Sequence, residues 1–432
     1  MKTAQGYFSE HFDEARKWRR ELHRHAQSAW VEFYATGFVA EKLSAWGYEV
    51  QLGEQIVAAG QRSFVPAGEV LADEYQKALD AGIKEEFIAP TKEGLTGVVG
   101  ILRGRQPGPT VAFRFDIDSN ELMESQDGAH RAAAEGYVSS HPGYAHMCGH
   151  DVHTAMGLLL AGYFAEHADQ IKGSVKFIFQ PDEEKLSGAA AMTAAGVVDD
   201  VDYLLGGHVG ITLTETGQVA LNVKDFLALT RSEITFTGKA SHSGVRPDLG
   251  RNALLGACTA ITSLHAIARH GLGASRINVG VIQGGTAWNV VPETTTFWLE
   301  TRAVTNEINR YMQERARDIL DGAAKMHGLE LAVTEKAHAP AGANSQQLVG
   351  MGTEVAKRLP WVKEVVPEIS FNASEDFMVM SNAVQKRGGK AVYVLHGTPV
   401  GGGHHSNTFE VDETVIRNGA DFFAAYYQEF VK

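Results

Sequence analysis

Predicted strands and helices alternate through the middle of the chain, and this pattern restricts the possible folds more than any other feature. Strands are expected at residues 96–103, 110–116, 174–180 and 202–206, and helices at 154–167 and 187–195. Alternation of this kind is typical of an α/β protein with a mostly parallel sheet covered by helices. Such sheets bind ligands beyond the carboxyl ends of their strands, so residues that follow the strands are the first candidates for a site.

The pattern changes after about residue 222. The expected order there is a strand at 231–237, a helix at 252–270, strands at 277–283 and 294–302, a helix at 307–326 and a strand at 329–335. This βαββαβ order is that of a ferredoxin-like domain. We therefore predict an inserted domain at residues 225–338, within a catalytic domain formed by residues 1–224 and 339–432. The first sheet is expected to resume at 364–370 and 390–395, before a closing helix at 413–430.

Length, charge and cysteine content exclude several classes of protein. A chain of 432 residues exceeds one ordinary core and fits two domains. The net charge of -13 argues against nucleic acid or an anionic membrane as a partner. The two cysteines, Cys148 and Cys258, do not suggest a disulfide framework, so a reducing compartment is expected. Neither a signal-type apolar run nor a membrane-length one is present, which predicts a cytoplasmic protein.

The segment MCGHDVHT places Cys148 and His150 two residues apart, just before a helical pattern. A thiolate and an imidazole at this spacing can bind one transition-metal ion from a tight turn, and Gly149 allows the backbone to bend there. Asp151 could hydrogen-bond a ligand histidine. The alternative is a buried structural cysteine near some histidines.

Acidic and imidazole side chains follow the next two strands. Glu183 and Glu184 close an apolar strand, and adjacent carboxylates repel each other unless a cation or a proton stands between them. One of them could bind a metal ion while the other moves protons; a solvated acidic turn is the alternative. His208 closes the following strand, where a structural role is the alternative. His404 and His405 follow three glycines near the C-terminus, and paired histidines on such a loop favour metal binding.

Together these residues predict a centre for two metal ions. The expected ligands are Cys148, His150, Glu184, His208 and His405. Such a mixture of donors suits Zn, Mn, Co or Ni. Five ligands exceed what one catalytic zinc normally takes, so two ions fit better, with the sulfur of Cys148 as a bridge. Glu183 is then the natural general base for a water molecule activated by the ions.

Two Gly-rich turns of the inserted domain carry further candidates. His242 lies in GKASHSG after a strand, where Ser and His can donate hydrogen bonds to a developing oxyanion; a polar hairpin turn is the alternative. Asn289 and Arg302 could supply an amide and a guanidinium to a substrate carboxylate, with a surface salt bridge as the alternative for Arg302.

The motifs occur in a recognisable order along nearly the whole chain. They are MCGHDVHT, FQPDEE, the GGH that ends at His208, GKASHSGVRPDLGRNAL, GGTAWNVVPE, SEDF at residues 374–377, and HHSNTFEVDE. In this order they resemble the aminoacylase-type metalloamidohydrolases, a family that includes hippurate hydrolases and plant auxin-conjugate hydrolases. Within the family the chain looks most like the branch that acts on p-aminobenzoyl-glutamate, to which the insertion at residues 53–91 also points.

The resemblance implies a two-metal peptidase fold whose inserted domain is a lid that also dimerises. It implies hydrolysis of p-aminobenzoyl-glutamate or a similar N-acyl or N-aryl amino acid amide, with two divalent ions, Mn or Zn, in each copy of the chain. The matched positions make Cys148 the bridging thiolate, Glu183 the base, and His405 rather than His404 the loop ligand. His242 matches a residue that reaches the site of the partner chain. The partner is a second copy or a related second chain.

Two departures from the family pattern bear on the substrate. The chain has Arg-Phe-Asp-Ile-Asp-Ser-Asn-Glu at residues 114–121 where the family usually has Arg-Ala-Asp-Met-Asp-Ala-Leu-Pro, and FQPDEE replaces FQPAEE. Three rival hypotheses remain open. The same machinery could act on hippurate, another N-acyl amino acid or a dipeptide; the chain could be a non-catalytic binding or regulatory subunit; or the metal could be purely structural.

Overall fold

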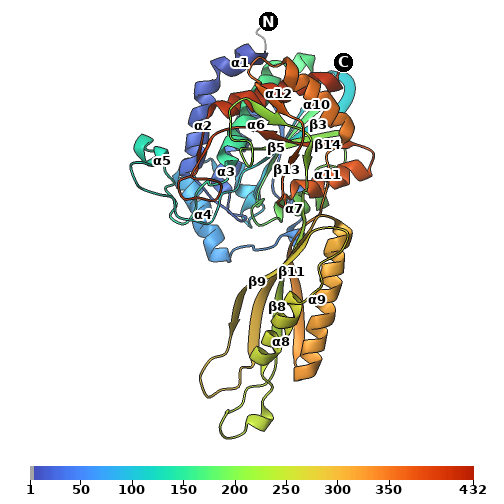
Figure 1. Ribbon diagram of the computed structural model, residues 1–432. Coiled ribbons are helices and arrows are strands. Elements are labelled where there is room, and N and C mark those ends of the chain that lie inside the picture. Colours follow the sequence, from blue (N-terminus) through green and yellow to red (C-terminus); the bar gives the residue numbers. More distant parts are fainter. Residues whose placement is uncertain (1–3) are drawn as a thin grey trace. The chain divides into compact units, whose positions relative to one another are not determined.

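The computed structural model describes residues 4–432, which form two compact units (Figure 1). The first unit holds the chain up to Lys224 together with Ala343–Phe371 and Asp376–Lys432. The second unit holds Asp225–Gly342 and the short segment Asn372–Glu375. The chain therefore leaves the first unit close to the sequence position where the strand pattern changes.

The first unit is built on a mixed sheet of eight strands. Their order across the sheet is β1 (Glu49–Gln51), β2 (Val98–Arg103), β4 (Lys172–Gln180), β3 (Gln106–Asp116), β5 (Tyr203–Val209), β14 (Lys390–His396), β6 (Gln218–Ala220) and β12 (Glu364–Val366). The central strands β4, β3, β5 and β14 are parallel, as are β6 and β12. The pairs β1–β2, β2–β4 and β14–β6 are antiparallel.

The expectation of a mostly parallel sheet is therefore not confirmed. Only two residues separate β2 from β3, and a parallel crossover needs a dozen residues or more. β2 must run opposite to β3, and hence opposite to β4, which lies between them.

Helices cover both faces of this sheet. The helices of this unit are α1 (Ala4–Glu10), α2 (Phe12–Arg24), α3 (Phe33–Ala45), α4 (Gly68–Asp80), α5 (Arg131–Glu135), α6 (His150–Glu166), α7 (Gly188–Ala194), α10 (Gln346–Arg358), α11 (Phe377–Lys386) and α12 (Thr414–Phe430). Side chains alternate along β3, so Phe115 packs against α6 and α12 while Arg114 reaches the start of α11 on the other face. Helix α6 is apolar all round and buried from His150 to Phe164, as its central position requires.

Short elements complete the first unit. Strands β7 (Val223–Lys224) and β13 (Ile369–Ser370) form a parallel pair, and β15 (Val400–Gly401) pairs with β16 (Glu410–Val411). The second of these ribbons carries the histidine loop. In the segment 53–91, helix α4 contributes Leu71 and Tyr75 to a small core with Phe33. No helix within residues 4–432 combines the length and the hydropathy that crossing a membrane requires.

The second unit has the element order β8 (Ala228–Thr237), α8 (Ala253–His265), β9 (Ser275–Gly284), β10 (Thr294–Ala303), α9 (Asn306–His327) and β11 (Glu330–Ala339). Its antiparallel sheet has the order β11-β8-β10-β9, and both helices lie on one face (Figure 1). Alternate residues such as Ile234, Phe236 and Phe297 point to the helices and form the core with Met312 and Leu320.

Candidate functional site

The four parallel strands at the centre of the first unit end at one edge of the sheet, and polar side chains follow them there. Asp118 comes two residues after β3, Glu183 and Glu184 come soon after β4, and His208 is the second-last residue of β5. The N-terminus of α6 points to the same edge, because Thr154 in its first turns donates a hydrogen bond to the carbonyl of Asp116, the last residue of β3.

A left-handed glycine sets the approach to α6. Gly149 has φ of 91°, and a Cβ atom there would lie 2.9 Å from Cγ2 of Val209. Any other residue would be strained and would press on β5. With glycine the backbone turns sharply, so Cys148 and His150 both reach the cleft from either side of the turn. The Sγ atom of Cys148 lies 3.3 Å from Nε2 of His208.

Potential metal donors gather in groups that share members. Their donor atoms lie within 4.8 Å of one another in the groups Cys148–His208–His404, Cys148–Glu184–His405 and His150–Glu183–Glu184. Cys148 and Glu184 each belong to two of these groups, so the sulfur and one carboxylate occupy the middle of the cluster. All five expected ligands and the expected base thus lie in one cluster of the first unit.

The hydrogen bonds of the imidazoles indicate which nitrogen atoms are available. His208 donates from Nδ1 to the carbonyl of Val209 at 2.8 Å, which leaves the Nε2 lone pair facing the sulfur. His404 differs, because its Nε2 accepts a hydrogen bond from the Ile211 N–H at 2.9 Å. Burial, together with the charge of His405, lowers the pKa of His404 to about 4. Neutral His404 then carries its proton on Nδ1, which lies 3.7 Å from the sulfur of Cys148.

His405 contacts the cluster through Glu184. Its Nε2 lies 3.4 Å from Oε2 of Glu184, and its backbone N–H donates to the carbonyl of Met147 at 2.7 Å. The backbone of His405 is left-handed, with φ of 61°, which is rare outside glycine. The loop therefore holds this histidine against Glu184 at a conformational cost.

Asp118 orients two of the expected ligands at once, although it is not among the site residues predicted from the sequence. Its Oδ1 accepts a hydrogen bond from Nδ1 of His150, and its Oδ2 accepts one from the Glu184 N–H, both at 3.0 Å. As a result, Nε2 of His150 faces Oε1 of Glu184 at 3.8 Å. Both atoms are buried and have no hydrogen-bond partner among the described residues. When Nε2 of His150 is deprotonated, the two atoms are facing acceptors, an arrangement that a divalent cation would satisfy.

The charge of the cleft also favours a cation. Burial acts against the charged form of His150, but Asp116 and Asp118 outweigh it and raise the pKa of His150 to about 10. Without a metal ion, Nε2 of His150 therefore carries a proton, which a bound ion would have to displace. Burial similarly opposes the charge of Glu184, but the contacts with His405 and His150 lower its pKa to about 2. Burial and the neighbouring carboxylates raise the pKa of the Cys148 thiol. A metal ion would therefore have to displace a proton from the sulfur.

A buried ionic network supports the cleft from behind the sheet edge. The guanidinium of Arg114 donates to Gln180 at 2.8 Å, to Asp116 at 2.7 Å and to Asp376 at 2.9 Å. Asp116 in turn accepts a hydrogen bond from Nδ1 of His153 at 2.5 Å. The SEDF motif thus contributes Asp376 as an anchor that joins β3, β4 and α11. In the sequence Glu375 and Asp376 are visible only as an acidic pair in a loop, so the role of Asp376 could not be predicted.

The candidates in the second unit fall into two places. His242 and Asn289 lie side by side, with Asn289 Nδ2 3.4 Å from Nε2 of His242. Nδ1 of His242 accepts hydrogen bonds from the N–H groups of Gly244 and Val245, so the neutral ring carries its proton on the exposed Nε2. Arg302 instead makes two hydrogen bonds to Glu300, at 2.6 and 3.2 Å.

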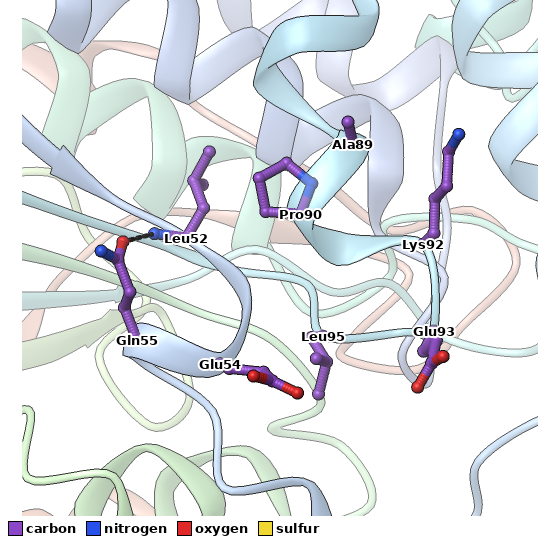
Figure 2. Close-up of a pocket in the computed structure, with 8 residues that line it drawn as sticks. All are labelled: Leu52, Glu54, Gln55, Ala89, Pro90, Lys92, Glu93 and Leu95. Atoms are coloured by element: carbon purple, nitrogen blue, oxygen red, sulfur yellow. Dashed lines mark hydrogen bonds between the residues drawn. The ribbon is translucent and has the colours of Figure 1, made fainter.

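A pocket of about 560 Å³ lies elsewhere on the first unit, at the base of the 53–91 segment (Figure 2). Figure 2 shows the eight side chains that line it: Leu52, Glu54, Gln55, Ala89, Pro90, Lys92, Glu93 and Leu95. No histidine or cysteine is among them, so this hollow is not the metal-donor cleft.

Comparisons with known proteins agree with the arrangement of the cleft. The model of peptidase family M20/M25/M40 matches residues 112–429. The chain is 44% identical to indole-3-acetyl-aspartic acid hydrolase of Enterobacter agglomerans over 95% of this chain and 94% of that protein. It is 41% identical to one subunit of the p-aminobenzoyl-glutamate hydrolase of Escherichia coli strain K12, over 92% of both chains.

Solved structures give the same picture. The aminobenzoyl-glutamate utilization protein from Klebsiella pneumoniae superposes with a TM-score of 0.82 at 36% identity, over 97% of this chain and 96% of that one. The YXEP protein of Bacillus subtilis, described as a dinuclear metal binding peptidase of the M20 family, has the same fold, with a TM-score of 0.69 at 23% identity. It covers 97% of this chain and 98% of its own.

Proposed function

The chain belongs to peptidase family M20/M25/M40, and from this membership we propose that it hydrolyses the amide bond of an aromatic N-acyl or N-aryl conjugate of an acidic amino acid. Two relatives above 40% identity are hydrolases of indole-3-acetyl-aspartic acid and of p-aminobenzoyl-glutamate. Both compounds join an aromatic group to an acidic amino acid through an amide. p-Aminobenzoyl-glutamate is the first substrate to test, and indole-3-acetyl-aspartate is the second.

The observation that carries the proposal is the pair of facing acceptors, Nε2 of His150 and Oε1 of Glu184, beside a sulfur flanked by imidazoles. The donor set fits two divalent ions, as in the YXEP protein. Cys148, His150, Glu184, His208 and His405 would hold these ions, with Cys148 and Glu184 in the middle of the donor set. Manganese or zinc suits these donors. A reducing compartment such as the cytoplasm would keep the Cys148 thiol free.

The bound ions would polarise the amide carbonyl and lower the pKa of the attacking water. Glu183 is the proposed base, because its Oε2 lies 3.9 Å from Nε2 of His150 at the edge of the donor cluster. It takes a proton from the water as the new C–O bond forms. It then gives this proton to the leaving nitrogen as the C–N bond breaks, so that a free carboxylic acid and a free amine result.

The second unit is proposed to act as a lid and a dimerisation domain. The proton on Nε2 of His242 is exposed and can donate a hydrogen bond to the oxyanion, with Asn289 beside it. Arg302 is proposed to bind the substrate carboxylate, although its pairing with Glu300 means that the carboxylate must compete with an existing partner. The partner is a second copy or a related second chain, because the Escherichia coli relative is named as one subunit of its enzyme.

Metal analysis followed by an amide panel tests the proposal. The purified protein, loaded with manganese or zinc, should cleave p-aminobenzoyl-glutamate or indole-3-acetyl-aspartate faster than hippurate, an N-acetyl amino acid or a dipeptide. Cys148→Ser should lower the metal content measured by mass spectrometry. A metal-loaded protein that cleaves none of these amides would instead support a non-catalytic role. An equal rate with either ion and without any ion would support a structural metal.

A further inference from the structure

A lysine follows the proposed metal ligand Glu184 directly. The Nζ atom of Lys185 lies 2.5 Å from Oε1 of Glu121, and this ion pair is partly exposed, with side-chain exposures of 25% and 50%. The same Nζ atom lies 5.7 Å from the centre of the Phe64 ring. A cation, an aromatic ring and a carboxylate that can be displaced are therefore grouped one residue away from the donor cluster.

Phe64 belongs to a small set of exposed apolar side chains in the described part of the first unit. Among the described residues of the first unit, the large hydrophobic side chains that are exposed are Phe64, Val65, Val70 and Met123. Phe64 and Val65 belong to the stretch that reaches Lys185, and Met123 comes two residues after Glu121. In the rest of the described part of that unit such side chains are buried or half-buried. The exposed Phe64 ring, beside Lys185, is therefore available to contact a ligand.

The 53–91 segment and the loop after β3 converge here. The 53–91 segment is fixed beside the turn after β4, because the Ser63 N–H donates to Oγ of Ser187 at 3.4 Å and the Ala58 N–H donates to the carbonyl of Ala191 at 3.1 Å. The loop after β3, which departs from the family pattern, contributes Glu121, which pairs with Lys185.

We propose that Lys185 binds the side-chain carboxylate of the substrate's acidic amino acid, while Phe64 contacts the aromatic group of the substrate. This inference rests on the proposed function and names the residues that select its substrate class. A partly exposed Lys–Glu pair contributes little to stability, so an incoming carboxylate can replace Glu121 at small cost. Lysine suits such an exchange because its ammonium is a compact charge without a fixed binding geometry. The Phe64 ring presents an apolar face beside the ammonium group of Lys185.

The test compares two substrates that differ only at the side-chain carboxylate, p-aminobenzoyl-glutamate and p-aminobenzoyl-glutamine. The manganese-loaded wild type should have the lower KM for the glutamate compound. Lys185→Met should raise that KM about ten-fold, the usual effect of losing a hydrogen bond to a charged group, and leave kcat and the glutamine compound unchanged. Lys92→Met, which removes an exposed lysine paired with Glu85, is the matched control and should change neither KM.

Two further variants separate the contributions of the group. Glu121→Gln removes the competitor of the substrate carboxylate, so the KM for the glutamate compound should fall or stay the same. Phe64→Ala should raise the KM of p-aminobenzoyl-glutamate and leave that of N-acetyl-glutamate unchanged, because the acetyl group has no ring to contact it.

The outcomes distinguish this inference from the proposed function. If Lys185→Met raises the KM of both p-aminobenzoyl compounds equally, or of neither, Lys185 does not bind the side-chain carboxylate. The proposed hydrolase function is unaffected by that result. If the wild type cleaves both compounds with equal KM, the subsite is likewise rejected. If the wild type cleaves no amide at all, the proposed function fails first and the inference fails with it.

Discussion

Replacing Asp118 by asparagine tests how the metal donors are held. The change keeps the size of the side chain but removes one of its two acceptor oxygens. In the native protein Oδ1 accepts from Nδ1 of His150 and Oδ2 accepts from the Glu184 N–H, each at 3.0 Å. An asparagine can accept from only one of these donors, and it turns its own NH2 group toward the other. Either the Glu184 N–H loses its acceptor, or Nδ1 of His150 keeps only the backbone carbonyl of Asp118, which lies 3.0 Å from it.

The size of the effect follows from that loss. A hydrogen bond to a charged group contributes about 1.5–3 kcal/mol, and every 1.4 kcal/mol is a factor of about ten in affinity. Asp118→Asn should thus weaken binding of a divalent ion by about ten- to a hundred-fold. This range agrees with the effect of removing residues that orient metal ligands in other proteins, about 10–100-fold.

The assay is titration of the metal-free protein with Mn²⁺ in competition with a chelator of known affinity. Asp321→Asn, at an exposed residue of α9 paired with Arg317, is the control and should bind manganese like the wild type. Chemical denaturation of each metal-free variant shows whether the fold is intact. A folded Asp118→Asn protein whose affinity lies within about three-fold of the wild type would refute the reasoning, because neither ligand would then depend on Asp118.

Three further predictions concern the base, the histidine loop and a buried acid. Glu183→Gln should abolish amide hydrolysis while metal content by mass spectrometry stays at the wild-type level; retained turnover would remove Glu183 as the base. His405→Ala should lower metal content more than His404→Ala, since the proton on Nδ1 of His404 suits a donor to the sulfur rather than a ligand; the reverse order would assign His404 as the ligand. Burial, with the charge of Asp118, raises the pKa of Glu32 from 4.5 to about 7. The folded state then binds more protons than the unfolded one between these pH values, so stability falls as pH rises, by about 3 kcal/mol from this group. Glu32→Gln should remove this part of the slope in denaturation curves between pH 4.5 and 8, and an unchanged slope would contradict it.

The order of elements in the central sheet and in the second unit could be predicted from the sequence because the hydrophobic periodicity of these elements is strong. The strand expected at 110–116 is the end of β3, and the helix expected at 154–167 is most of α6. Helices α10 and α11 were not expected. The antiparallel strand β6 was also not expected, since three residues between two loops give no readable period.

The residues of the candidate site also divide into those that could be predicted from the sequence and those that could not. Cys148, Glu184 and His208 could be selected because each follows a predicted strand or opens a helix, and strand ends meet at one edge of a sheet. Arg114 and Asp376 could not be paired in advance, since 262 residues separate them and both lie in apolar or loop sequence. Asp118 was visible only as a second acid after Asp116, and its two hydrogen bonds depend on where α6 and the turn after β4 come to lie.

Two short loops each hold a residue of the proposed metal site close to a residue of the proposed carboxylate subsite, which has a consequence for how substrate choice could change. The loop after β3 holds the orienting residue Asp118 and, three positions on, Glu121. The turn after β4 holds the proposed ligand Glu184 and, next to it, Lys185. Neighbouring residues point in different directions. Asp118 and Glu184 face the metal donors, whereas Glu121 and Lys185 pair with each other and Lys185 lies beside the Phe64 ring. Substitutions at Glu121 or Lys185 can therefore alter which amide is bound without disturbing the hydrogen bonds that hold Glu184, whereas a change at Asp118 disturbs the metal donors first.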